Sequence, residues 1–389
     1  MKKAGIISVY YQNANYGGQL QSFALPYALR RLGIDAEQIC FNRHTYEMQA
    51  RIARLFSGSF PQKIKALSSI VFHTFEPAIY HVKDLSVQNS LQTRINVFKQ
   101  FEKQIPHSKS IVDKDTIGSI VDKYDIFICG SDVIWNAGIE PYISALGFVP
   151  ESKHKIAYAP SLGTSDLPLG WYERYKKYIN RLDAISVREE SIAECLQSYM
   201  PDTKVYCVAD PTLLLSDDEW GQFCKPQDMQ EDKYILCYLL GDSIEQRRRA
   251  IELSRTLDLK LLTFPYITNN HFRKCDYNFG DIQNFSADSF DFISLIKNAD
   301  LVVTDSFHAV VFSSIFHIPF IALDRTNGNQ TKMGGRVRNF LELTELKHQL
   351  GTLKDDSWTY ILDKIDYSKL DLKLSSIRNM SFNYLKESI

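Results

Sequence analysis

The sequence predicts an α/β protein built from two parallel-sheet domains. Short apolar runs rich in valine and isoleucine alternate with helix-forming stretches along most of the chain, and this alternation favours parallel sheets. The 389 residues also exceed the usual size of one hydrophobic core. A polar stretch over 217–232 interrupts the series. We therefore expect a first domain over 1–225, a second over 226–345 and a helical segment over 346–389.

The composition is that of a globular protein with no excess of either charge. Lys+Arg number 45 and Asp+Glu 46, for a formal net charge of -1, so nucleic acid is not an expected partner. The seven cysteines are scattered and form no CxxC or Cys/His cluster, which favours a reducing compartment and no zinc. No apolar stretch approaches the roughly 20 residues that cross a bilayer. These features predict a cytoplasmic protein without a metal ion.

The N-terminus predicts a strand, a polar loop and a helix. Gly5–Tyr10 is an apolar run too short for a signal peptide, and Gln19–Leu32 is amphipathic. Between them, Asn15, Gly17 and Gly18 would let the backbone approach a ligand closely, because glycine has no Cβ. A plain turn is the alternative, since a pair of glycines alone is weak evidence for a site.

After this first helix the sequence predicts a second strand and then a long helical passage up to residue 105. Ile34–Phe41 is predicted as the second strand, and Pro26 should kink or restart the preceding helix, because a straight helix would lose roughly 3 kcal/mol there. Residues 51–105 mix basic residues with phenylalanine and isoleucine, which predicts an inserted helical lobe. Its basic amphipathic pieces are compatible with peripheral contact with an anionic membrane, but a solvated helix face explains them as well.

A polar cluster follows the predicted strand Asp125–Cys129. Asp132 is suited to orient a sugar hydroxyl, and Trp135 is suited to stack on a sugar ring. The alternative is that Asp132 caps the next turn and Trp135 packs in the core. Asn136 completes the cluster.

The next two predicted strands, Ile156–Ala159 and Asp183–Val187, repeat the pattern of an apolar run that ends in polar residues. Ser161 follows the first of them and Arg188 the second. Arg188 either binds a carboxylate of a ligand or pairs with the neighbouring glutamates. Val205–Ala209 predicts one more strand.

The second domain is organised around Ala299–Leu323, which predicts a strand, a tight turn, a buried helix and another strand. Ser306 stands where the helix would be capped, and His308 lies in its first turn. Unpaired N–H groups and the helix dipole favour an anion there, so both side chains would face a phosphate or carboxylate. A capping serine and a histidine bonded to a carbonyl are the alternative. Before this unit we expect a strand at Tyr234–Leu240, a helix at Ser243–Leu257, a strand at Lys260–Phe264 and a helix at Ser289–Asn298.

A basic, glycine-bearing loop comes next and carries Arg325, Lys332, Arg336 and Arg338. Four cations near the predicted start of a helix are the strongest candidate in the chain for binding an anion. Solubility alone accounts for some of them.

Six motifs, taken in order, resemble the signatures of the polysaccharide pyruvyl transferase family along nearly the whole chain. They are Asn15-Tyr16-Gly17-Gly18, Gly130-Ser131-Asp132 with Trp135-Asn136, Tyr158-Ala159-Pro160-Ser161, Ser186-Val187-Arg188-Glu189, Asp210-Pro211-Thr212 and Thr304-Asp305-Ser306-Phe307-His308. The resemblance implies two Rossmann-like domains that face each other across a cleft, as in GT-B glycosyltransferases. In one departure, several relatives have an arginine where this chain has Ser306, so Arg325, Arg336 or Arg338 would supply that charge.

The resemblance also implies an activity: transfer of the enolpyruvyl group of phosphoenolpyruvate onto a saccharide, free or lipid-linked, to form a pyruvate ketal. Such ketals belong to capsule, exopolysaccharide or cell-wall glycan, and the reaction needs no cofactor besides this co-substrate and no metal. Catalysis is assigned to His308 and Asp132, since a histidine suits an acid that reloads near neutral pH. The donor-binding residues would be Arg188, Ser306, Arg325, Lys332, Arg336 and Arg338. The acceptor-binding residues, on the first domain, would be Asn15, Gly17, Gly18, Trp135, Asn136 and Ser161.

Two other functions fit the same architecture. One is a GT-B glycosyltransferase that uses a nucleotide sugar, and the other is a non-catalytic scaffold of a polysaccharide assembly complex. In each case the expected location is the cytoplasm, extending to the inner face of the cell membrane.

Overall fold

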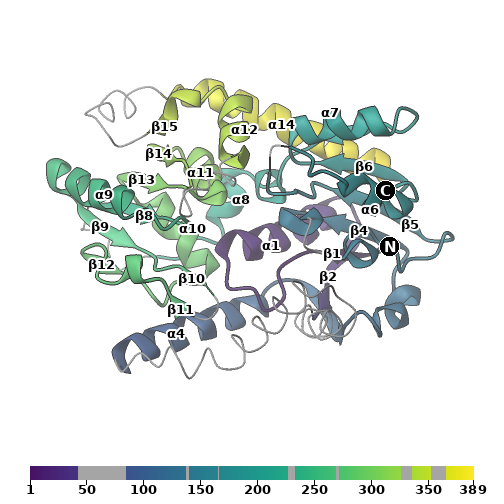
Figure 1. Cartoon of the computed structure of the whole chain (residues 1–389), viewed down its shortest axis with the longest axis horizontal. Helices are drawn as coiled ribbons and strands as arrows, with labels where there is room; N and C mark the ends of the chain where they lie inside the picture. Colours follow the sequence, from purple (N-terminus) through teal and green to yellow (C-terminus); the bar gives the residue numbers. More distant parts are fainter. Residues whose placement is uncertain are drawn as a thin grey trace, which may run out of the picture.

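Two parallel β-sheets with helices packed around them make up the computed structural model of the chain (Figure 1). The structure describes residues 1–42, 85–136, 140–164, 166–226, 233–268, 271–325, 335–351 and 365–389. Residues 51–84 of the predicted helical lobe, and Lys332, lie outside these ranges. The α/β class and the two parallel sheets confirm the fold that the sequence predicts.

The first sheet has seven parallel strands in the order β3-β2-β1-β4-β5-β6-β7. They are β1 (Lys3–Ile7), β2 (Asp35–Phe41), β3 (His107–Val112), β4 (Ile126–Gly130), β5 (His154–Tyr158), β6 (Ala184–Val187) and β7 (Val205–Cys207). The order reverses between β1 and β4, and open α/β sheets bind ligands outside the carboxyl ends of the strands at such a point. The sequence analysis missed β3, which is an edge strand with a largely polar sequence and partly exposed residues.

The second sheet repeats this topology, with the order β12-β9-β8-β13-β14-β15. Its strands are β8 (Tyr234–Tyr238), β9 (Lys260–Thr263), β12 (Ile282–Gln283), β13 (Leu301–Thr304), β14 (Phe320–Leu323) and β15 (Leu350–Gly351). Here the order reverses between β8 and β13. The edge strand β15 carries the second sheet past residue 345, where the sequence places the domain boundary. A separate antiparallel pair is formed by β10 (Ile267–Thr268) and β11 (His271–Phe272).

Helices connect these strands. The longer ones in the described residues are α1 (Tyr16–Arg31), α4 (Leu85–Glu102), α6 (Trp171–Ile179), α7 (Glu190–Tyr199), α9 (Ile244–Leu257), α10 (Ser289–Lys297), α11 (Phe307–Ile315), α12 (Gly335–Leu343) and α14 (Tyr367–Ser388). Shorter ones are α5 (Pro141–Ser144), α8 (Asp217–Gly221), and the 3-10 turns η1 (Ile117–Lys123), η2 (Asp132–Trp135), η3 (Pro211–Leu214), η4 (Lys274–Asp276) and η5 (Lys347–Gln349). No helix in the described part of the chain combines the length and the apolar character needed to cross a membrane.

Helix α1 continues through Pro26 instead of restarting there. Proline has no N–H, so the carbonyl of Ser22, four residues earlier, loses its helical donor. The side chain of Gln38 in β2 donates to this carbonyl at 2.9 Å. A hydrogen bond from the neighbouring strand thus replaces the one that proline removes, which the helix sequence alone could not indicate.

One apolar core extends across both sheets. Tyr16 of α1 stacks on Phe292 of α10, with ring centroids 4.4 Å apart and an interplanar angle of 3°. From α4, the buried Arg94 donates to the carbonyl of Phe285, which precedes α10, at 3.0 Å. Helix α4 follows the first strands in sequence, yet it reaches the second domain, so it fastens the two domains together.

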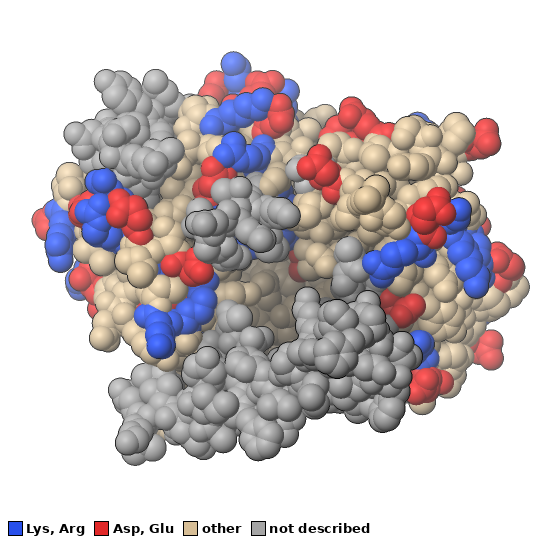
Figure 2. Space-filling view, viewed as in Figure 1, with Lys and Arg blue, Asp and Glu red and all other residues tan. Residues whose placement is uncertain are grey.

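The C-terminal helix α14 crosses back from the second sheet to the first (Figure 1, yellow). The hydroxyl of Tyr384 donates to the carbonyl of Ala157 in β5 at 2.7 Å. The hydroxyl of Ser381 accepts from the N–H of Ala209, beyond β7, at 2.9 Å. On the face seen in Figure 2, acidic and basic side chains are interspersed, in keeping with the near-equal numbers of the two charges.

Candidate active site

Polar side chains from both sheets meet between the two domains, beyond the carboxyl ends of the strands. The first domain contributes Asp132 after β4, Arg188 and Glu189 after β6, and Asp210 after β7. The second contributes His308 after β13, Arg325 after β14 and Arg336 in the first turn of α12. All seven are buried. Burying this many ionisable groups is costly unless they pair with each other or with a ligand.

Asp210 is the centre of the group. Its Oδ2 accepts a hydrogen bond from Arg188 Nη1 at 2.6 Å and lies 3.7 Å from His308 Nε2. Its Oδ1 accepts from the N–H and the hydroxyl of Thr212, at 3.0 and 2.8 Å. Burial alone would raise the pKa of Asp210, but His308, Arg188 and the Thr212 N–H hold that pKa well below its usual range. Asp210 is therefore an ionised carboxylate shared by a histidine and an arginine.

His308 lies in the first turn of α11, as the sequence predicts. Its Nε2 is buried and has no hydrogen-bond partner in the part of the chain that the structure describes. The alternative of a histidine bonded to a neighbouring carbonyl is thus wrong for this nitrogen. The ring of Phe307 meets the imidazole edge to face, with centroids 5.0 Å apart.

Arg188 lies between two carboxylates and an aromatic ring. Besides its bond to Asp210, its Nε is 3.4 Å from Glu189 Oε1, and its guanidinium carbon lies 4.6 Å from the ring centroid of Phe307. Glu189 Oε1 also accepts from the hydroxyl of Ser161 at 2.5 Å. Both proposed roles of Arg188 remain compatible with this geometry. Nε and Nη1 are paired with carboxylates, whereas Nη2 is buried and has no partner among the residues described.

Arg336 links the domains. Its Nη1 donates to Asp132 Oδ1 at 3.2 Å, and its Nε is buried with no partner in the described ranges. Burial, with a further contribution from the nearby positive charge of Arg188, lowers the pKa of Arg336 to about 10. A second anion beside this guanidinium would therefore be stabilised.

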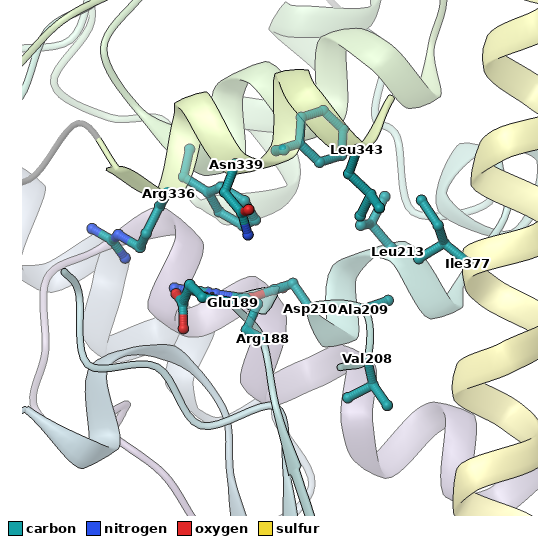
Figure 3. A pocket seen from close by; sticks show the side chains of 12 residues that line it. Arg188, Glu189, Val208, Ala209, Asp210, Leu213, Arg336, Asn339, Leu343 and Ile377 are labelled. Carbon is teal, nitrogen blue, oxygen red and sulfur yellow. Dashed lines mark hydrogen bonds and ion pairs between the residues drawn. The ribbon is translucent and has the colours of Figure 1, made fainter. Parts of the chain in front are cut away.

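A pocket opens along these side chains and contacts both domains (Figure 3). One end is charged and includes Arg188, Glu189, Asp210 and Arg336. The other end is apolar and is formed by Val208, Ala209, Leu213, Phe340, Leu343 and, from α14, Ile377. Its empty space, counting the open mouth, is about 350 Å³.

Ser306 and Asp305 occupy the turn before His308. Ser306 is at the N-cap position of α11, but its side chain makes no capping hydrogen bond, contrary to the capping alternative. Asp305 accepts from the N–H groups of Leu240 and Gly241, at 2.6 and 2.7 Å. Its carboxylate holds the loop after β8, and Arg325 Nη2 donates to its carbonyl at 3.2 Å.

Trp135 is not available to a sugar. The side chain is fully buried, its Nε1 donates to the carbonyl of Ser144 at 3.0 Å, and its ring packs against Trp171. The predicted stacking role is therefore wrong in this structure, and the alternative of core packing is confirmed. The neighbouring Asn136 is exposed, and its Nδ2 donates to the carbonyl of Leu162 at 3.3 Å.

The glycine pair lies inside a helix instead of in a loop. α1 begins at Tyr16, one turn earlier than predicted, because the side chain of Asn15 caps it by accepting from the N–H of Gly18 at 2.9 Å. Gly18 is buried, and a Cβ there would meet its neighbours at ordinary contact distances, whereas Gly17 lies against His308. A ligand approaching Gly17 would meet the imidazole first.

Arg338 lies apart from the group. Its side chain is 54% exposed and pairs with Asp324, with Nε 2.9 Å from Oδ1. The structure thus brings Arg188, Arg325 and Arg336 together with His308 and Asp132, and leaves Arg338 on the surface. Lys332 falls outside the described residues.

The sequence analysis gave no role to Asp210, Glu189 or Asn339, although all three line the pocket. Asp210 directly follows an apolar run, the same signal that singled out Asp132 and Arg188. Asn339 lies within a helix, one turn after Arg336, and no local pattern distinguishes it from a solvated polar residue.

The two Rossmann-like domains, joined face to face with their polar strand ends in between, define a GT-B-type fold. Solved structures with this fold are similar over nearly the whole chain. UDP-GlcNAc 2-epimerase from Methanocaldococcus jannaschii has 13% sequence identity and a TM-score of 0.53, with 94% of this chain and 93% of that chain covered. The S. aureus MnaA-UDP co-structure has 15% identity and a TM-score of 0.51, with 98% and 92% covered. At such identities the likeness shows the fold alone.

A family model described as polysaccharide pyruvyl transferase matches residues 15–327. Because the match covers most of the chain, the protein belongs to the polysaccharide pyruvyl transferase family and is a transferase. A comparison with curated proteins gives no match.

Proposed function

We propose that this protein transfers the enolpyruvyl group of phosphoenolpyruvate to a saccharide and forms a pyruvate ketal during surface polysaccharide biosynthesis. The observation that supports the proposal is a set of three buried nitrogens with no hydrogen-bond partner among the described residues, namely Arg188 Nη2, Arg336 Nε and His308 Nε2. The two arginines suit the carboxylate and phosphate of the donor. The histidine suits the proton transfer that the reaction needs.

The chemistry requires one proton on carbon and two new C–O bonds. A proton adds to the methylene carbon of phosphoenolpyruvate, and one sugar hydroxyl oxygen bonds to the adjacent carbon. A second hydroxyl oxygen then displaces phosphate from the same carbon. The protons also balance. One hydroxyl proton restores the acid that protonated the carbon, and the other leaves with phosphate.

Each step has a candidate residue in the group. Arg188 and His308 meet on one oxygen of Asp210, so an anion on Arg188 Nη2 would lie near the imidazole. The Asp210 carboxylate lies 3.7 Å from His308 Nε2, the nitrogen that would donate the proton to carbon. Glu189 Oε2, which is buried and has no hydrogen-bond partner among the described residues, would accept a proton from a sugar hydroxyl. Asp132 would act through Arg336 instead of as an acid.

The direct test is incubation with phosphoenolpyruvate and candidate saccharides bearing two neighbouring hydroxyls. We expect phosphate release that depends on the acceptor, and an acceptor whose mass rises by one pyruvate less one water. A saccharide modified from a nucleotide sugar, with phosphoenolpyruvate untouched, would instead support a glycosyltransferase. Absence of turnover with every donor would support the scaffold alternative. We further propose a cytoplasmic location, at the inner face of the cell membrane where the acceptor is lipid-linked.

Ligand binding gives a simpler expectation. Phosphoenolpyruvate should raise the melting temperature, because a ligand at about 100 times its Kd stabilises the folded state by about 2.7 kcal/mol. UDP-sugars at the same concentration should leave the melting temperature unchanged. Differential scanning fluorimetry measures both, and a shift with UDP-sugars alone would contradict the proposal.

Two arginine variants compare a buried arginine of the proposed donor site with an exposed arginine of the same helix. Arg336→Met should weaken phosphoenolpyruvate binding by roughly tenfold or more, because a charge-assisted hydrogen bond contributes about 1.5–3 kcal/mol. Arg338→Met is the matched control on the same helix and should leave affinity unchanged, since Arg338 is exposed and paired with Asp324. Isothermal titration calorimetry measures both affinities. Equal effects of the two changes on affinity would mean that phosphoenolpyruvate does not bind at Arg336.

A further inference from the structure

The imidazole of His308 lies directly against the backbone of Gly17, which belongs to the opposite domain. A Cβ atom at Gly17 would stand 1.9 Å from His308 Nδ1 and 2.4 Å from its Cγ. Both distances are far inside van der Waals contact, so no larger residue fits at this position while the ring stays where it is. The neighbouring Gly18 is different, because a Cβ there would be 3.5 Å from its nearest neighbour, the carbonyl oxygen of Val9.

The backbone itself does not require glycine at position 17. Gly17 is in the first turn of α1, and it is not among the residues with positive φ. Glycine inside a helix is less favourable than alanine, because it loses more conformational freedom on folding. The space taken by the imidazole is therefore the physical reason for a glycine here.

The ring is confined on its other sides as well. Nε2 is 3.7 Å from Asp210 Oδ2, and the ring of Phe307 packs edge to face against the imidazole. We infer that Gly17 is a positioning residue for His308: it leaves room for the ring, so that Nε2 stays beside Asp210. The inference rests on the proposed function, in which His308 donates the proton.

The first test compares two alanine substitutions. Gly17→Ala should lower kcat for phosphate release by about a hundredfold, the loss that a displacement of about 1 Å causes at a reacting centre. The KM for phosphoenolpyruvate should change by no more than about twofold, because the arginines are untouched. Gly118→Ala is the control: Gly118 lies in η1, where a Cβ would meet nothing within 4 Å, and this change should alter neither constant. A folded Gly17→Ala protein with normal kcat would overturn the inference.

The second test works in a background without the ring. In His308→Ala, added imidazole should restore part of the turnover, because the ring can re-enter the space beside Gly17. In Gly17→Ala/His308→Ala the added methyl group occupies that space, so imidazole should restore none, while Gly118→Ala/His308→Ala should keep the rescue. Equal rescue in His308→Ala and in Gly17→Ala/His308→Ala would overturn the inference. This test remains usable even if Gly17→Ala alone fails to fold.

The melting temperature supplies a readout that is independent of activity. Gly17→Ala should lower the melting temperature of the wild type, because the methyl group collides with the ring. The same change should raise it in the His308→Ala background, because alanine favours the helix once the ring is gone. Equal effects in both backgrounds would show that Gly17 and His308 do not interact. If the wild type releases no phosphate from phosphoenolpyruvate, the proposed function fails, whereas the melting-temperature comparison still decides the contact.

Discussion

His308→Ala should fold, bind phosphoenolpyruvate and lose turnover by roughly 10²- to 10⁴-fold, the span usual for one general acid. Folding should survive because Nε2 makes no hydrogen bond to any residue that the structure describes. Binding should survive because the two arginines that would hold the donor are separate side chains. Phosphate release measures kcat, and calorimetry measures donor affinity.

His317→Ala is the internal control for this prediction. His317 stands just beyond the other end of α11, half-exposed, with Nε2 2.8 Å from Asp371 Oδ1. An exposed pair of this kind contributes about 0–1 kcal/mol to stability, so activity should be unchanged. The role proposed for His308 would be wrong if its removal left turnover intact, or if His317→Ala abolished turnover instead.

Asp210→Asn should cause the largest loss of stability in the site, about 3–5 kcal/mol, the cost of removing one partner of a buried ion pair. It leaves Arg188 buried with only the longer contact to Glu189, at 3.4 Å, and removes the carboxylate beside His308. Turnover should fall with stability, because His308 and Arg188 both lose the carboxylate that lies beside them. Guanidinium unfolding measures the first effect and phosphate release the second.

Asp324→Asn provides the comparison, since it removes a carboxylate from the exposed pair with Arg338 and should cost at most about 1 kcal/mol of stability.

The pH dependence of stability adds a second check on Asp210. Because the pKa of Asp210 is lowered in the folded state, its stabilisation is present above the usual aspartate pKa of about 3.9. It is lost only as the pH falls through the lowered value. The difference between wild type and Asp210→Asn should therefore persist at about pH 5, and its disappearance there would contradict the assignment.

The sequence by itself determined the architecture and the polar strand ends. Alternating apolar and amphipathic runs identified most strands of both sheets, and the residues after β4, β6 and β13 pointed to Asp132, Arg188 and His308. This works because a buried parallel strand needs a continuous apolar run, and because polar groups concentrate where such a strand ends. The edge strand β3 escaped this reasoning, since a strand with one exposed side needs no such run.

Only the tertiary structure decided which side chains meet. The pairing of Arg336 with Asp132 joins residues 204 positions apart, and the contact between Gly17 and His308 joins two helices of different domains. Trp135 and Arg338 also show that the local sequence does not determine what a side chain contacts. Both stand next to promising residues in the chain, yet one turns into the core and the other to the solvent. Local sequence fixes where a side chain leaves the backbone, but the packing of one domain on the other fixes what it contacts.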